Sequence, residues 1–179
     1  MNLANKLTLL RIFLVPVFMF FLLVQMPYGE YLSVAIFILA ALTDSLDGYI
    51  ARNRNQVTKF GKFMDPLADK LLVTAALISL VEMGKLSAWV TFLIVAREFA
   101  ITGLRVLAAS ENITIAASWW GKVKTITQMI AIVVLLLDNF PFSYLGFPFD
   151  SIMVGAAVVF TIISGADYLY KNRSVFMNM

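Results

Sequence analysis

Long apolar stretches alternate with short polar ones along the chain. Most apolar stretches run for about 20 residues, the length that a helix needs to cross the hydrocarbon core of a bilayer. Gly- and Pro-containing turns separate some of them, at residues 27–29, 83–85 and 138–148. The pattern predicts an all-α integral membrane protein, with six transmembrane helices at residues 7–26, 31–50, 66–82, 86–107, 119–137 and 147–169. We expect a single transmembrane domain over residues 1–179.

Composition supports a membrane environment. Of the 179 residues 61% are hydrophobic and only 14% are charged, and the mean hydropathy is +0.87. Soluble domains are closer to 45–50% apolar and about 25% charged, so a soluble core of this size could not bury the excess. We expect the first span to be retained, because no small-residue cleavage site follows Val24.

The chain contains neither Cys nor His. Disulfides, thiolate nucleophiles, imidazole bases and His-ligated zinc are therefore excluded. Acid–base chemistry is left to carboxylates, Lys or Tyr. A metal site would have to be built from oxygen ligands, which suit Mg²⁺ or Mn²⁺.

Basic residues are distributed unevenly between the two predicted sides of the membrane. Six spans place both termini on one side, which receives 13 of the 14 Lys and Arg residues, while Lys85 remains on the other. By the positive-inside rule the termini and the connections at 51–65 and 108–118 are cytoplasmic. For Arg11, Lys171 and Arg173 we favour a simple anchoring role at the membrane surface.

Four aspartates gather near one predicted hairpin. Asp44 and Asp47 are three residues apart at the end of the second span, and Asp65 and Asp69 are four apart at the start of the third, so each pair shares a helix face. Four close carboxylates raise one another's pKa unless cations neutralise them. Two divalent cations would do so, and such a pair can clamp the attacking and leaving oxygens of an in-line phosphoryl transfer.

Small residues and one arginine accompany the acids. Gly48 lacks a Cβ, so a nucleotide could approach the backbone there, and Ala51 has only a small side chain on the next turn. Arg52 has a planar guanidinium group that can donate two hydrogen bonds to a phosphate. The alternative for Gly48 and Gly61 is close packing between membrane helices.

Together these residues read D-x2-D-G-x2-A-R-x8-G-x3-D-x3-D from Asp44 to Asp69. This pattern is similar, position for position, to the signature of the CDP-alcohol phosphotransferases. These are six-helix membrane enzymes, typically dimeric, that transfer a substituted phosphoryl group from a CDP-linked donor to an alcohol and release CMP. The resemblance implies that Asp44, Asp47 and Asp65 bind one metal ion and that Asp44, Asp65 and Asp69 bind a second. Asp69 would also be the base for the acceptor hydroxyl.

The resemblance also implies a nucleotide site. Residues 5–11, with Asn5, Thr8 and Arg11, look like the N-x2-T-x2-R start of these enzymes. The residues expected to line the cytidine diphosphate site are Asn5, Thr8, Gly48, Ala51, Arg52, Thr58 and Gly61.

Three further segments resemble a bacterial branch of the family, the phosphatidylglycerophosphate synthases. They are Arg97-Glu98, residues 103–105 and residues 120–125. This implies CDP-diacylglycerol as donor and glycerol 3-phosphate as acceptor, whose phosphate needs cations; the candidates are Arg97, Arg105, Lys122 and Lys124. Ordinary membrane anchoring is the alternative for the two lysines. For Arg97 and Glu98 it is pairing within the helix bundle.

Other acceptors and one other function stay open. Serine has no phosphate for these cations, whereas an inositol phosphate would use them similarly. A cation transporter also needs acids in the membrane, but its site is expected near the midplane and often within repeats, neither of which is visible. We expect a homodimer in the cell membrane, surrounded by lipid, with its active site on the cytoplasmic side and no nucleic-acid partner.

Overall fold

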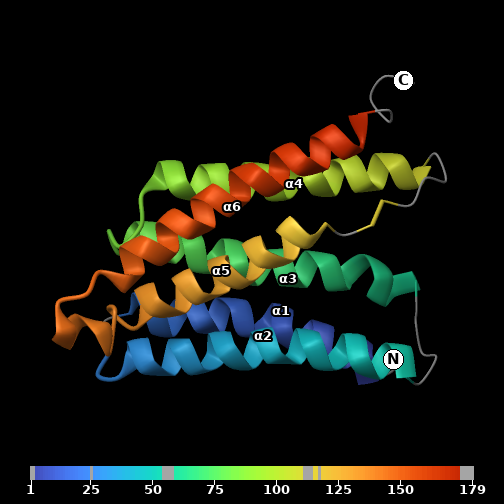
Figure 1. Cartoon of the computed structure of the whole chain (residues 1–179). Coiled ribbons are helices and arrows are strands. Elements are labelled where there is room, and N and C mark those ends of the chain that lie inside the picture. The colour runs from blue at the N-terminus through green and yellow to red at the C-terminus, as the bar shows by residue number, and fades with distance from the viewer. Residues whose placement is uncertain (1–2, 25, 54–58, 111–114, 117, 174–179) are drawn as a thin grey trace. The chain divides into compact units, whose positions relative to one another are not determined.

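The computed structural model describes residues 3–24, 26–53, 59–110, 115–116 and 118–173, with the backbone alone at 3–4, 44–53, 59–63, 65–66 and 110. Within these ranges the secondary structure is entirely helical (Figure 1). The elements are α1 (Leu3–Leu23), α2 (Gly29–Asn53), α3 (Lys59–Glu82), α4 (Ala88–Ser110), α5 (Trp119–Leu136), the short 3-10 helix η1 (Phe142–Leu145) and α6 (Phe149–Lys171).

The prediction of six long helices is confirmed, with shifted boundaries at some ends. The first helix ends at Leu23 rather than residue 26, ahead of a turn in which Tyr28 has a φ of 63°. The third begins at Lys59, well before residue 66. The sequence prediction places helix ends where the apolar residues stop. Helical hydrogen bonds join backbone groups, so a helix can extend past that point through turns that carry charged side chains.

The chain divides into two compact units, residues 1–85 and 86–179. In the first unit α1 contacts both α2 and α3. Phe18 and Phe37 are fully buried with ring centroids 5.7 Å apart. Gly29 brings the start of α2 close to the end of α1, because a Cβ there would lie 2.6 Å from the Phe21 carbonyl oxygen. Alanines in the same core, among them Ala40, let the helices approach closely.

In the second unit α6 packs against both α4 and α5. Ser118 caps α5, its hydroxyl accepting a hydrogen bond from the Gly121 amide at 3.1 Å. The connection from α5 to α6 is braced by Asn139, which donates to the Phe147 carbonyl at 2.7 Å and accepts from the Asp150 amide at 3.2 Å. The α5–α6 hairpin is therefore stabilised both by packing between the two helices and by hydrogen bonds in the connection that joins them.

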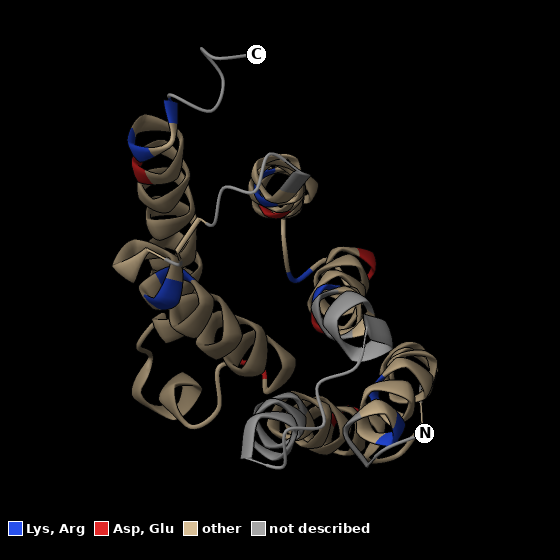
Figure 2. Ribbon diagram, turned by 90° about the vertical axis from the view of Figure 1, so that its right-hand side faces the viewer, with Lys and Arg blue, Asp and Glu red and all other residues tan. Residues whose placement is uncertain are grey.

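The described helices include candidate membrane spans. Three of them are long and apolar enough to cross a bilayer, at Asn5–Leu23, Trp119–Leu136 and Phe149–Lys171, and a shorter apolar helix covers Gly29–Thr43. Figure 2 shows most of the ribbon as uncharged, with Lys, Arg, Asp and Glu confined to short stretches. The other long helices are α2, α3 and α4, in which charged residues interrupt the apolar segment. Most of the predicted site residues lie on these three helices.

Candidate active site

The acidic motif lies on α2 and α3, two helices that run in opposite directions (Figure 1). Lys85, just after the end of α3, has its Nζ 3.3 Å from Oε1 of Glu30, which is near the start of α2. This ion pair joins the start of one helix to the end of the other. The end of α2 and the start of α3, which carry the four aspartates, therefore both lie toward the opposite end of the unit.

The four aspartates also lie at matching heights. Asp47 and Asp65 are each about six residues from the helix end next to the 54–58 connection, and Asp44 and Asp69 are about nine and ten residues from it. At ~1.5 Å per residue these distances are about 9 Å and about 14 Å along the helices. Along the backbone, each acid of α2 therefore has an acid of α3 at a similar distance from the shared connection.

Asp69 is the one member of the motif whose side chain the structure describes. It is exposed on the surface of the first unit, whereas its neighbours Ala68 and Leu72 are buried in the core. The face of α3 that carries Asp69 thus points away from that core. Among the described side chains no group of three or more acids could hold a metal ion; Asp44, Asp47 and Asp65 lie outside them.

The donor set fits hard divalent cations. Four carboxylates near the end of α2 and the start of α3, in a chain without His or Cys, supply oxygen ligands alone. Mg²⁺ and Mn²⁺ prefer such ligands. The predicted metal-binding residues therefore suit the ions expected from the sequence.

Most predicted nucleotide-site residues on α2 and α3 are placed by backbone alone. Gly48, Ala51 and Arg52 belong to the last turns of α2, and Gly61 to the first turn of α3. Thr58 lies outside the described residues. The four helical positions flank the same connection as the aspartates.

A buried polar stripe on α1 faces these two helices. Asn5, Thr8 and Arg11 follow one another at three-residue steps and are 7%, 0% and 0% exposed. The Nε of Arg11 donates a hydrogen bond to the Ala40 carbonyl of α2 at 3.1 Å, one turn before Asp44. Our prediction that Arg11 anchors the chain at the membrane surface is wrong, because the guanidinium is buried between helices. Its spacing from Asn5 and Thr8 was the signal for this.

Replacing Arg11 with Met should destabilise the first unit. A buried hydrogen bond to a charged group contributes roughly 1.5–3 kcal/mol, so we expect the free energy of unfolding to fall by about 2 kcal/mol. Thermal unfolding in detergent measures the effect. Lys6→Met is the matched control, because Lys6 is exposed on the same helix; equal losses in the two variants would contradict the buried role of Arg11.

The four predicted acceptor cations lie on α4 and α5 of the second unit. Arg105 and Lys122 are exposed, Arg97 is largely buried and Lys124 is 1% exposed. Lys124 is paired with Glu98, which it contacts through Nζ and Oε1. The Nη1 atom of Arg97 lies 3.8 Å from the same carboxylate oxygen. The pairing of Arg97 and Glu98 that we considered from the sequence is thus present, and Lys124 takes part in it.

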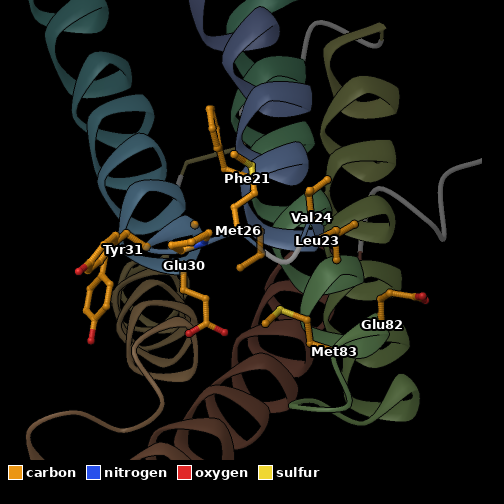
Figure 3. Close-up of a pocket in the computed structure, with 12 residues that line it drawn as sticks. Phe21, Leu23, Val24, Met26, Glu30, Tyr31, Glu82 and Met83 are labelled. Atoms are coloured by element: carbon orange, nitrogen blue, oxygen red, sulfur yellow. The ribbon is translucent and has the colours of Figure 1, made fainter.

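A pocket of about 800 Å³ lies in the first unit, at the α1–α2 turn. Phe21, Met26, Glu30, Tyr31 and Met83 are among the side chains that line it (Figure 3). Glu30 and Lys85 mark this end of the unit as the one opposite the aspartates. The pocket is therefore separate from the acidic motif.

The helical architecture, the membrane spans and the paired acidic helix ends define a membrane protein with a candidate phosphoryl-transfer site. Residues 1–163 match the family described as CDP-alcohol phosphatidyltransferase, and the chain belongs to this family.

Several curated proteins resemble the chain over nearly its whole length. A Bacillus subtilis protein named "CDP-diacylglycerol--glycerol-3-phosphate 3-phosphatidyltransferase" is 48% identical, covering 96% of this chain and 95% of its own. A Rickettsia bellii protein of the same name is 37% identical, covering 98% and 97%. A Mycobacterium tuberculosis "Probable phosphatidylglycerophosphate synthase" is 44% identical, covering 95% and 81%.

Proposed function

We propose that this protein transfers the phosphatidyl group of CDP-diacylglycerol to glycerol 3-phosphate, giving phosphatidylglycerophosphate and CMP. The observation that carries the proposal is 48% identity, over nearly the full length of both chains, to a relative named for this reaction. The complete motif of eight specified positions from Asp44 to Asp69 agrees with it.

Asp69 starts the reaction as the general base. Its carboxylate takes the proton of the acceptor's C1 hydroxyl, and the resulting alkoxide oxygen attacks the phosphorus that bears the diacylglycerol. The bond from that phosphorus to the oxygen of the CMP phosphate breaks, and CMP leaves. The position of Asp69 on the outer face of α3 leaves its carboxylate accessible to a substrate.

All four acids would hold divalent cations. Asp44, Asp47 and Asp65 would bind one ion, and Asp44, Asp65 and Asp69 a second, consistent with the general metal dependence of the family. When bound, such ions neutralise the acids and stabilise negative charge on the diphosphate. Asn5, Thr8, Gly48, Ala51, Arg52, Thr58 and Gly61 would line the site of the cytidine diphosphate.

The acceptor's phosphate is assigned to cations of the second unit. Arg97 lies in the middle of α4, Arg105 is near the end of α4 and Lys122 is in the first turn of α5, and all three provide donors suited to a phosphate. Lys124 is already paired with Glu98 and is not assigned to the phosphate. Serine lacks a phosphate that such cations could bind.

Arg105→Ala should raise the KM for glycerol 3-phosphate about tenfold or more and leave the KM for CDP-diacylglycerol nearly unchanged. The reason is that Arg105 is exposed and free of the Glu98 pairing, so its loss removes a phosphate contact without opening the core. Steady-state kinetics in mixed micelles measure both constants. A parallel rise in the two KM values would place the acceptor pocket elsewhere.

All six helices cross the cell membrane in this proposal, and residues 1–179 form one transmembrane catalytic domain that assembles as a homodimer. The uneven distribution of Lys and Arg places both termini and the active site on the cytoplasmic side. The exposed Trp89 and Tyr144 lie close to connections that would face the other side, where aromatic residues are common.

Single cysteines can test this topology, because the chain has none of its own. Asn55→Cys should react with an impermeant maleimide only in inside-out vesicles or permeabilised cells. Tyr144→Cys, at a position that is 83% exposed, should react in intact cells. The reverse pattern would refute the proposed orientation.

The function is tested by CMP release from purified protein with CDP-diacylglycerol and Mg²⁺. Glycerol 3-phosphate, inositol phosphate and serine are supplied separately, and we expect release with glycerol 3-phosphate alone. Release with another acceptor would keep the chemistry and change the substrate. No release from folded protein with any acceptor would overturn the proposal and favour ion transport, the other function that intramembrane acids indicate.

A further inference from the structure

A charge pair in the second unit links α4 to α5 around Glu98. Lys124 is among the largest fully buried side chains, and its ammonium group contacts the Glu98 carboxylate. A buried ammonium group without a partner would be strongly unfavourable. Lys124 therefore depends on Glu98 for its charged state.

Arg97 is the second cation beside this carboxylate and is less well satisfied. Its Nη1 atom is 3.8 Å from Glu98 Oε1, beyond ordinary hydrogen-bonding distance. Its Nε is buried and has no hydrogen-bond acceptor among the described residues. Because two cationic groups share one carboxylate, the cluster carries excess positive charge.

The surroundings of Arg97 increase this excess. A Cβ on Gly121 would lie 3.8 Å from Arg97 Nη2, so the guanidinium lies against the first turn of α5, the positive end of that helix dipole. On its other side, a Cβ on Gly165 of α6 would lie 3.5 Å from Arg97 Cγ. The side chain thus runs between α5 and α6.

A second polar group in this region also lacks a partner. Tyr168 of α6 is 4% exposed, and its hydroxyl has no hydrogen bond within the described part of the chain. It lies within electrostatic reach of both Arg97 and Arg105. Unmatched donors and a surplus of positive charge in one place indicate that an anion completes the cluster.

We propose that Glu98 and Lys124 form a charge-balanced pair that positions Arg97 to bind the phosphate of the acceptor. Lys124 does not contact that phosphate, because the Glu98 carboxylate already compensates the charge of its ammonium group. Glu98 acts through the two cations and is a positioning residue. This inference rests on the proposed function and goes beyond it by dividing roles among the cations.

A double-mutant cycle tests the pair. Glu98→Gln leaves the buried Lys124 ammonium group without this carboxylate, and Lys124→Met leaves Glu98 to pair with Arg97 alone. The double variant removes both charges of the pair and keeps a similar volume. We expect each single change to raise the KM for glycerol 3-phosphate tenfold or more, with the KM for CDP-diacylglycerol within threefold of the unmodified protein. The double variant should return to within threefold of the unmodified protein for both substrates.

The matched control is another Lys–carboxylate pair among the described residues of this unit. Lys171 Nζ is 2.7 Å from Asp167 Oδ1, and the Lys171 side chain is 62% exposed. Lys171→Met should leave both KM values unchanged, because the ammonium group that is lost is mostly solvated, unlike that of Lys124. Arg97→Lys should raise the acceptor KM even though it keeps the charge, since Lys lacks the planar fork.

Several outcomes would overturn the assignment. A folded double variant as impaired as Lys124→Met would make Lys124 a direct phosphate ligand, and single variants with an unchanged acceptor KM would make the pair purely structural. If the single variants fail to fold, the acceptor KM of the double variant tests the proposal. A double variant that also fails to fold would refute charge balance between Glu98 and Lys124. Lack of transfer by the unmodified protein would instead refute the proposed function.

Discussion

Asp69→Asn is expected to lower kcat for transfer to glycerol 3-phosphate by about 10³-fold, within the range attributed to a general base. The amide keeps the size of the side chain and one oxygen ligand but cannot take the hydroxyl proton. Because the side chain lies on the exposed face of α3, opposite the buried Ala68, the change should leave the core intact. Binding of CDP-diacylglycerol in the presence of Mn²⁺ should weaken less than tenfold.

Two measurements separate the base from a ligand role for Asp69. The first is single-turnover CMP release, and the second is equilibrium binding of the CDP-lipid. Glu82→Gln is the matched control, an exposed acid at the other end of α3, and should change neither. If Asp69→Asn loses binding as severely as turnover, Asp69 has no separate role as the base.

Chelation of divalent cations should abolish transfer, and Mg²⁺ or Mn²⁺ should restore it. Oxygen ligands are the only strong ones that this chain offers, so soft metals should not substitute. In the proposed site Asp47 binds one of two ions, whereas Asp44 and Asp65 bind both. Titration with Mn²⁺, followed by electron paramagnetic resonance, should give two ions per chain and about one in Asp47→Asn.

The same titration supplies its own controls. Glu82→Gln should keep two ions, since it lies far along α3 from the acidic helix ends. Asp65→Asn should lose more affinity than Asp47→Asn, because it shares both ions. A single Mn²⁺ per unmodified chain, or no effect of Asp47→Asn, would contradict the two-ion arrangement.

The helices and the acidic motif could be predicted because both depend on local sequence. About 20 apolar residues in succession favour a membrane helix whatever the rest of the chain does. The three- and four-residue spacings of Asp44–Asp47 and Asp65–Asp69 place each pair on one helix face through helix geometry alone. Helix ends were less predictable, as the early start of α3 at Lys59 shows, because backbone hydrogen bonding continues where apolar side chains stop.

Which charged residues are buried was not predictable in the same way. Arg11 and Lys171 have similar sequence surroundings, an apolar helix with a cation near one end, and we expected both to anchor the chain at the surface. Arg11 is fully buried against Ala40, whereas the Lys171 side chain is 62% exposed. The difference arises from what packs against each helix face, and the polar neighbours Asn5 and Thr8 were the only local sign.

The membrane class, the six helices, the oxygen-only chemistry and the carboxylate motif can all be predicted from the amino-acid sequence. Each of these follows from composition or from spacing within one or two neighbouring helices. Only the tertiary structure decided that Arg11 is a core residue and that Lys124 is neutralised by Glu98, 26 residues away. Such roles depend on contacts between helices, where burial makes every unpaired charge unfavourable and so requires a partner.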